Sequence, residues 1–260
     1  MCRLFALAAV AALAAGGPGC SSKSSGRSIR VAAAADLAHA FGELANEFKA
    51  RTGIAVDVEY GSSGLLAKQI EQGAPFALFA AANRDYVEQV VKTGKCDAAT
   101  ARAYARGRVV VWTRTGVAPP EKLADLADPR FRKIAIANPE HAPYGRAARQ
   151  ALEKAGLWPA LESRIVLGEN VQATMLYARD GNADAAIVAL SLAAVTDGGA
   201  SLPIDPALHA PLDQAMVVCG SGPMVDDAKQ LEAFISSREG REVMTRYGFT
   251  LPADAPAAPP

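Results

Sequence analysis

Hydrophobic and polar positions follow two rhythms along this chain, one typical of strands and one typical of helices. Residues 54–60 (IAVDVEY) are apolar at every second position, which predicts a half-exposed strand. The segment before them carries Leu37, Phe41, Leu44 and Phe48, at spacings of four, three and four residues. Such spacing places the four side chains on one face of a helix.

The same reasoning predicts the remaining elements. Strands are expected at residues 29–34, 76–81, 108–112, 133–138, 164–168, 184–190 and 214–220. Helices are expected after the GSSG turn at 61–64, around 86–92, and at 146–156, 171–181 and 226–249, with a loop at 139–145. Because strands and helices alternate, the fold class is α/β, with sheets covered by helices. We expect two lobes, the first built from 29–110 and 214–251 and the second from 111–213.

Both ends of the chain depart from these rhythms. Residues 1–19 combine an early arginine with an apolar run at 4–15 that is too short to span a bilayer, which predicts an export signal. Cys20 stands where small residues meet a Ser-rich tether at 20–28, as in a bacterial lipoprotein signal, so we expect a lipid anchor on Cys20. Ordinary cleavage that frees a secreted chain is the alternative. Residues 252–260 (PADAPAAPP) are expected to be a disordered tail.

Composition and charge narrow the possible functions. The 260 residues carry a formal net charge of zero, so the basic face needed to bind nucleic acid or an acidic lipid surface is not expected. The chain contains neither a CxxC nor an HExxH motif. Two cysteines remain in the folded part, Cys96 and Cys219, and export would permit a disulfide, but the sequence leaves their pairing open.

Candidate chemistry lies at four strand-to-helix junctions, near Ala35, Ser63, Tyr144 and Val171. The first N–H groups of a helix lack partners within it and lie at the positive end of its dipole, so these junctions can hold anions. The turns offer small side chains, hydroxyls and backbone but neither lysine nor arginine, which favours a small, fully deprotonated tetrahedral oxyanion. Ser62 is expected to brace its turn. Ordinary helix capping is the alternative for any single junction.

The segments VAAAADLAHAF, YGSSGLLAKQIEQGAPF, IANPEHAPYGRAARQALEKAGLW, GENV, IVALSLA and RYGF resemble the periplasmic molybdate-binding proteins of ABC importers. The resemblance covers roughly residues 29 to 250. It implies a two-lobed periplasmic-binding-protein fold (type II), with mostly parallel sheets and a ligand cleft between the lobes. It also implies a periplasmic or extracytoplasmic receptor that captures molybdate or tungstate and delivers it to an ABC transporter permease.

The resemblance also assigns roles to individual residues. It implies that Ser63 binds the oxyanion through hydroxyl and amide, Tyr144 through phenol or amide, and Val171 through its main-chain amide. Many relatives have a serine where this chain has Asp36. A carboxylate cannot face a dianion, so we expect only the amide of Asp36 or of Ala35 to contribute, with the Asp36 side chain capping its own helix.

Other functions are also compatible with the sequence. A receptor for another oxyanion such as sulfate would have the same fold, and so would a signalling module coupled to a membrane kinase. A hydrolase could use Ser63 with His141 and Glu140, but GSSG is not the G-x-S-x-G nucleophile elbow. We expect a monomeric binding protein that is not an enzyme and has no cofactor.

Overall fold

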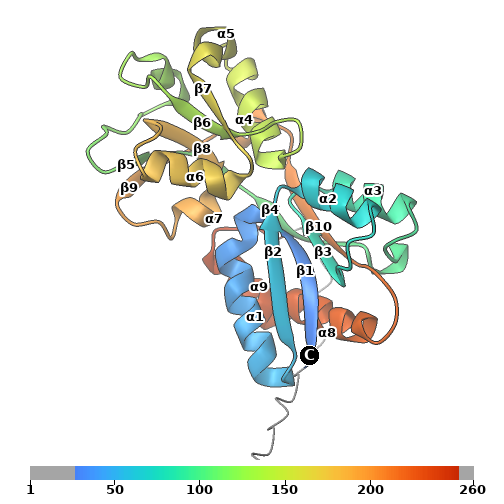
Figure 1. Cartoon of the computed structure of the whole chain (residues 1–260). Helices are drawn as coiled ribbons and strands as arrows, with labels where there is room; N and C mark the ends of the chain where they lie inside the picture. Colours follow the sequence, from blue (N-terminus) through green and yellow to red (C-terminus); the bar gives the residue numbers. More distant parts are fainter. Residues whose placement is uncertain (1–26, 252–260) are drawn as a thin grey trace, which may run out of the picture.

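The computed structural model describes residues 27–251, which form two lobes, each built on a five-stranded sheet (Figure 1). The two-lobed α/β periplasmic-binding-protein fold predicted from the sequence is confirmed. The predictions about the export signal, Cys20 and the C-terminal tail lie outside the described residues. Among residues 27–251, no helix is long and apolar enough to cross a membrane.

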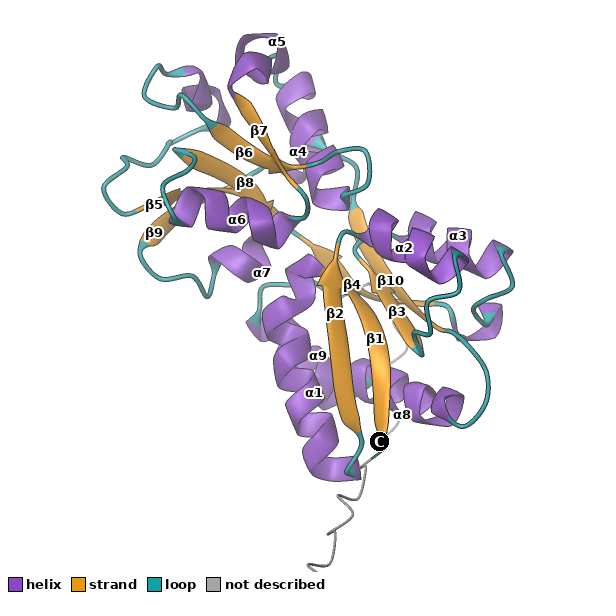
Figure 2. Ribbon diagram, in the orientation of Figure 1, coloured by secondary structure: helices purple, strands orange, loops and turns teal. Residues whose placement is uncertain are grey.

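The first sheet has the strand order β2-β1-β3-β10-β4. Its strands are β1 (Ser28–Ala34), β2 (Ala55–Gly61), β3 (Leu78–Ala81), β4 (Arg102–Gly107) and β10 (Leu212–Val218). The helices of this lobe are η1 (Ala35–Leu37), α1 (Ala38–Thr52), α2 (Ser63–Glu71), α3 (Arg84–Lys92), η2 (Ala98–Thr100), α8 (Met224–Ser236) and α9 (Arg238–Arg246). They cover both faces of the sheet (Figure 2).

Buried strand residues alternate between these two layers of helices. Ala32 of β1 packs in one cluster with Leu66 of α2 and Val87 of α3. Val31, its neighbour, packs in the larger cluster that also contains Leu44 of α1. Since successive strand side chains point to opposite faces, a strand that is covered on both sides reads as a continuous apolar run.

The second sheet has the strand order β7-β6-β8-β5-β9. Its strands are β5 (Val109–Arg114), β6 (Ile134–Ala137), β7 (Ile165–Gly168), β8 (Ala185–Ala189) and β9 (Gly199–Pro203). The helices are η3 (Leu123–Ala127), α4 (Pro143–Lys154), α5 (Trp158–Leu161), η4 (Glu162–Arg164), α6 (Val171–Arg179), α7 (Leu190–Ala193) and η5 (Pro206–Leu208).

Each sheet contains one strand that runs against the others. β10 is antiparallel to β3 and β4, and β5 is antiparallel to β8 and β9. These are the two strands by which the chain enters a sheet after crossing from the other lobe. A crossing chain arrives at the edge where the parallel strands end, so it must run back across the sheet.

The positions of these crossings differ slightly from the predicted lobe boundaries. Val109 and Val110 pair with β8 in the second sheet, although the sequence placed them in the first lobe. Leu212 and Asp213 pair with β4 in the first sheet, although the sequence placed them in the second lobe. Apolar patterning continues through a crossing, so it does not show where a strand changes partner.

The sequence also missed two strands and the start of one helix. β4 and β9 are edge strands, and neither shows a simple alternation of buried and exposed residues. Helix α4 begins at Pro143 and not at residue 146, because proline suits the first position of a helix. Tyr144 therefore lies in the first helical turn and not in a loop.

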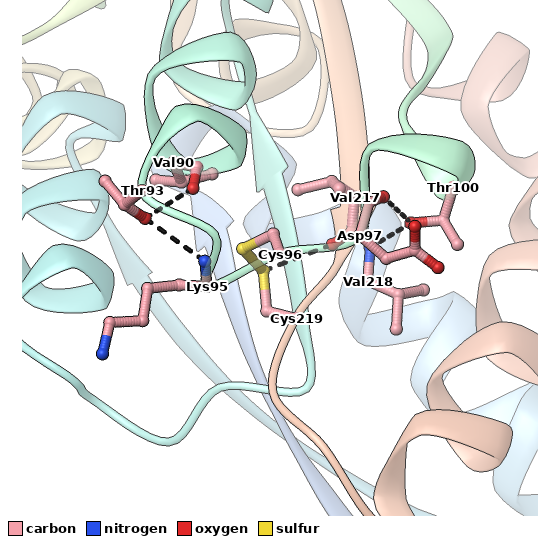
Figure 3. The surroundings of a disulfide bond; sticks show 9 residues. All are labelled: Val90, Thr93, Lys95, Cys96, Asp97, Thr100, Val217, Val218 and Cys219. Carbon is pink, nitrogen blue, oxygen red and sulfur yellow. Dashed lines mark hydrogen bonds between the residues drawn. A yellow bond between two sulfur atoms is a disulfide. The ribbon is translucent and has the colours of Figure 1, made fainter.

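Cys96 and Cys219 form a disulfide, which settles the pairing that the sequence left open (Figure 3). The bond joins the segment before η2 to the residue after β10, and both cysteines are buried. Neighbouring hydrogen bonds support it, since Asp97 N–H donates to the Val218 carbonyl at 2.9 Å and Val218 N–H donates to Thr100 Oγ1 at 2.9 Å. The disulfide therefore ties parts of the first lobe that are distant in sequence.

Candidate oxyanion site

The four predicted junctions meet around one small cavity in the cleft between the lobes. Its lining includes all five residues that the sequence singled out, namely Ala35, Asp36, Ser63, Tyr144 and Val171. They come from η1, α2, α4 and α6, so three α-helices point their N-termini at the cavity. Among residues 27–251, no lysine or arginine lines it. The cavity is thus surrounded mainly by neutral groups and main-chain N–H donors.

A larger cavity lies away from this cleft, between α3 and β4. Charged side chains line it, among them Arg84, which pairs with Glu88 at 3.0 Å, and Arg102, which pairs with Glu232. None of the predicted site residues contributes to it. The candidate site is therefore identified by the convergence of helix N-termini and not by the size of the cavity.

Ser63 is positioned as a double donor toward this cavity. Its side chain is buried, and its Oγ accepts a hydrogen bond from Ala82 N–H at 3.0 Å. A hydroxyl that already accepts has its own proton free to donate. The Ser63 N–H belongs to the first turn of α2, where N–H groups have no acceptor within the helix. One residue can therefore give an anion both a hydroxyl and an amide.

Ser62 does not brace its own turn, contrary to the prediction. Its hydroxyl donates to the main-chain carbonyl of His141 and lies 2.8 Å from His141 Nδ1. The same carbonyl accepts from Gly64 N–H at 3.0 Å and from Tyr86 Oη at 3.3 Å. Three donors of the first lobe thus hold one carbonyl of the loop that precedes α4. This contact fastens the two lobes across the cleft beside the cavity.

The geometry around His141 does not match a serine hydrolase. His141 Nδ1 contacts Ser62, whereas Ser63 accepts its hydrogen bond from Ala82. Burial lowers the pKa of His141, and no carboxylate within residues 27–251 forms a hydrogen bond with its ring. A triad needs a base bonded to the nucleophile and an acid bonded to the base. The alternative based on Ser63, His141 and Glu140 therefore has no geometric support.

The phenol of Tyr144 does not fill the anion-binding role that the sequence left open for it, because it bonds to another side chain. The side chain is buried, and its Oη donates to Asp36 Oδ2 at 3.0 Å. Burial raises the pKa of Tyr144 well above its ordinary value, and the nearby Asp36 raises it further, so the phenol keeps its proton. The main-chain amide of Tyr144, in the first turn of α4, is the group left for an anion.

Asp36 does not cap its own helix, which corrects the prediction. Its Oδ2 accepts from Tyr144 and from Gln214 Nε2, and Tyr104 Oη donates to Gln214 Oε1 at 2.8 Å. Its main-chain carbonyl accepts from Ser191 Oγ at 2.7 Å. Burial raises the pKa of Asp36 to about 6, although the two side-chain hydrogen bonds act in the opposite direction. The carboxyl group thus lies in a buried polar network that joins the lobes.

Sequence reasoning missed the partners in this network, Tyr104, Gln214 and Ser191. Each comes from a different element, β4, β10 and α7, and is distant in sequence from Asp36. Gln214 was assigned to the start of a strand, and nothing in its sequence neighbours indicated a buried amide. The only available signal was a polar residue directly before a buried apolar run.

Val171 is the first residue of α6, and its side chain is buried. The preceding residue, Asn170, caps the helix, because its Oδ1 accepts from Ala173 N–H at 2.9 Å. The cap satisfies that amide and leaves the earlier Val171 N–H without an acceptor within the helix. Asn170 also lines the cavity. The arrangement suits donation from the Val171 amide to a bound anion.

Among residues 27–251, neither a metal-binding cluster nor a cationic side chain lines this cavity. Within residues 27–251 there is no cluster of histidine, cysteine and acidic side chains that could hold a metal ion directly. Arg146 of α4 is the cationic residue nearest in sequence to the predicted site residues. Its guanidinium lies over the ring of Tyr86, 5.1 Å from the ring centroid, and it is not among the residues that line the cavity. A ligand would therefore be held by hydrogen bonds and helix dipoles and not by ion pairs.

Comparison with known proteins agrees with this architecture. The family model for bacterial extracellular solute-binding proteins matches residues 29–250. The molybdate-binding protein ModA of Azotobacter vinelandii is 32% identical over 93% of this chain and 96% of its own length. A putative ABC transporter substrate-binding lipoprotein of Bacillus subtilis is 30% identical over 89% of this chain and 92% of its own.

A solved structure also shows similarity to a solute-binding protein. The structure of the Azotobacter vinelandii periplasmic molybdate-binding protein matches with a TM-score of 0.81 at 30% identity, covering 86% of this chain and 99% of that one. These relatives are solute-binding proteins. The chain belongs to the bacterial extracellular solute-binding protein family.

Proposed function

We propose that this chain is an extracytoplasmic receptor that captures one molybdate or tungstate ion and delivers it to an ABC importer. The observation that carries the proposal is the convergence of the Ser63, Tyr144 and Val171 helix N-termini on one cavity that no lysine or arginine lines. Relatives that are named as molybdate-binding proteins support the choice of ion.

In this proposal each junction supplies neutral donors to the oxygens of the ion. Ser63 gives its hydroxyl and amide, while Tyr144 and Val171 give main-chain amides. The turn at Ala35 and Asp36 closes the remaining side. A fully deprotonated oxyanion only accepts hydrogen bonds, so it matches a cavity that mainly donates them.

The selectivity of the site is the first test. Calorimetric titration of the mature chain should show one molybdate or tungstate bound per protein, and weaker binding of sulfate. The reason is size, because donors spaced for the larger ions would leave sulfate with stretched hydrogen bonds. Sulfate binding as tight as molybdate binding in side-by-side titrations would favour the alternative, a receptor for a smaller oxyanion.

We further propose that the receptor is held at a bacterial membrane by a lipid on Cys20, as the sequence of its N-terminal segment indicates. The wild-type protein should then fractionate with membranes, and Cys20→Ala should not be retained there by a lipid. An unmodified N-terminus beyond residue 20, found by mass spectrometry of the wild-type protein, would contradict the anchor.

A further inference from the structure

Asp36 presents a chemical problem that the proposed function does not resolve. Its side chain is buried and lines the cavity proposed for a doubly charged anion. An ionised carboxylate there would repel the ion at short range.

The two carboxyl oxygens of Asp36 have different surroundings. Oδ2 accepts two hydrogen bonds, from Tyr144 Oη and Gln214 Nε2. Oδ1 is buried and has no hydrogen-bond partner within residues 27–251. Buried polar atoms are rarely left without a partner, and Asp36 lines the cavity, so a ligand bound there is the candidate partner of Oδ1.

Within residues 27–251, no positively charged group forms a hydrogen bond or ion pair with the Asp36 carboxyl. The carboxyl meets Tyr144 of α4, Gln214 of β10 and its own main-chain amide, all neutral. Ser191 of α7 bonds only to the Asp36 main-chain carbonyl, and Tyr104 of β4 lies behind Gln214. Other elements packed on its turn carry ionisable side chains that make no hydrogen bond with it, including His39 and Glu43 of α1, Tyr60 of β2 and Arg179 of α6.

We infer that Asp36 takes up a proton when the oxyanion binds, and that its carboxylic acid then donates a hydrogen bond from Oδ1 to an oxygen of the ion. The inference rests on the proposed function, since it concerns the same cavity. The proton comes from the solvent, and no other bond is made or broken. Oδ2 keeps its two donors when Oδ1 is protonated, but both hydrogen bonds favour the ionised carboxylate and become weaker.

The environment of Asp36 makes this proton uptake accessible near neutral pH. Burial raises the pKa of the carboxyl to about 6 without an anion present. A neighbouring dianion favours the neutral acid further, so the pKa in the complex is higher than in the free protein. The site would therefore offer the anion an acid that donates a hydrogen bond only when it is protonated.

Proton linkage fixes the direction of the pH dependence. Above about pH 6, the free protein has lost the proton that the complex holds, so affinity should fall as pH rises, approaching tenfold per pH unit. Below that pH both states hold the proton, and the affinity should level off. His141 is mainly neutral over the upper range because burial lowers its pKa, so it does not account for the slope.

The test is calorimetric titration of the mature chain with molybdate between about pH 7 and pH 8.5, in two buffers with different enthalpies of ionisation. The heats should report uptake of close to one proton per ion. Asp36→Asn should bind with an affinity that does not change over this range, because the amide donates but does not titrate. Asp57→Asn, which changes an exposed carboxylate on β2, should keep the wild-type slope.

Two results would overturn the inference. One is molybdate binding by the wild type without proton uptake in either buffer, which needs no variant and leaves the proposed function intact. The other is an Asp36→Asn protein that keeps the wild-type pH slope. Absence of molybdate binding at every pH would instead overturn the proposed function, and with it this inference.

Discussion

Replacing Ser63 with alanine should weaken molybdate binding by about 10- to 100-fold. A hydrogen bond to a charged group contributes about 1.5–3 kcal/mol, and each 1.4 kcal/mol corresponds to a factor of ten in affinity. The substitution removes the hydroxyl and leaves the Ser63 amide at the start of α2. It also leaves the Ala82 N–H without the acceptor that it has at 3.0 Å, so the Ala82 turn loses support.

The substitution should also lower the free energy of unfolding by about 1–3 kcal/mol, because it leaves the buried Ala82 N–H without an acceptor. Ser201→Ala is a matched control, because Ser201 is exposed on edge strand β9. Ser62→Ala is not a neutral control, since Ser62 bonds to His141 across the cleft. Titration and ligand-free thermal melting separate the two effects. If Ser63→Ala binds as tightly as Ser201→Ala, the hydroxyl serves only the Ala82 turn and the site is misplaced.

Loss of the Cys96–Cys219 disulfide should lower the free energy of unfolding by about 2–5 kcal/mol. The bond closes a loop across a sequence separation of 123 residues, and a long loop restricts the unfolded chain strongly. A double Cys96→Ala, Cys219→Ala variant should therefore unfold at a lower denaturant concentration. Molybdate binding should change little under native conditions, because neither cysteine lines the oxyanion cavity.

Reduced wild-type protein is the matched control for this variant. It lacks the bond but keeps both buried sulfur atoms, so it separates loss of the cross-link from loss of packing. We expect most of the destabilisation to appear in the reduced wild type. Equal unfolding midpoints for the oxidised and reduced proteins would show that the disulfide is dispensable for stability.

The sequence predicted those parts of the fold that depend on local patterning. The spacing from Leu37 to Phe48 identified α1, because one face of that helix is buried. Alternation along residues 54–60 identified the edge strand β2, although its residues are at most partly buried. The edge strands β4 and β9 show no simple alternation of buried and exposed residues and were missed. The reversed directions of β5 and β10 depend on where the chain crosses between lobes, which patterning does not record.

For the candidate site too, the sequence predicted the local features but not those that depend on distant residues. The four junctions could be found from the sequence, since each small-residue turn directly precedes a helix. The directions of the side chains could not, because they depend on partners that are distant along the chain. Asp36 bonds to Gln214, and Ser62 bonds to His141. A buried carboxyl network and a cross-cleft contact therefore appear only in three dimensions.

The most direct test of this account is a crystal structure of the mature chain with molybdate, recorded with anomalous scattering from molybdenum. We predict one anomalous peak in the cavity lined by Ser63, Tyr144 and Val171, with the oxygens of the ion within about 3 Å of Ser63 Oγ and of the Ser63 and Val171 amide nitrogens. A peak outside this cleft, for instance in the charged cavity between α3 and β4, would contradict it.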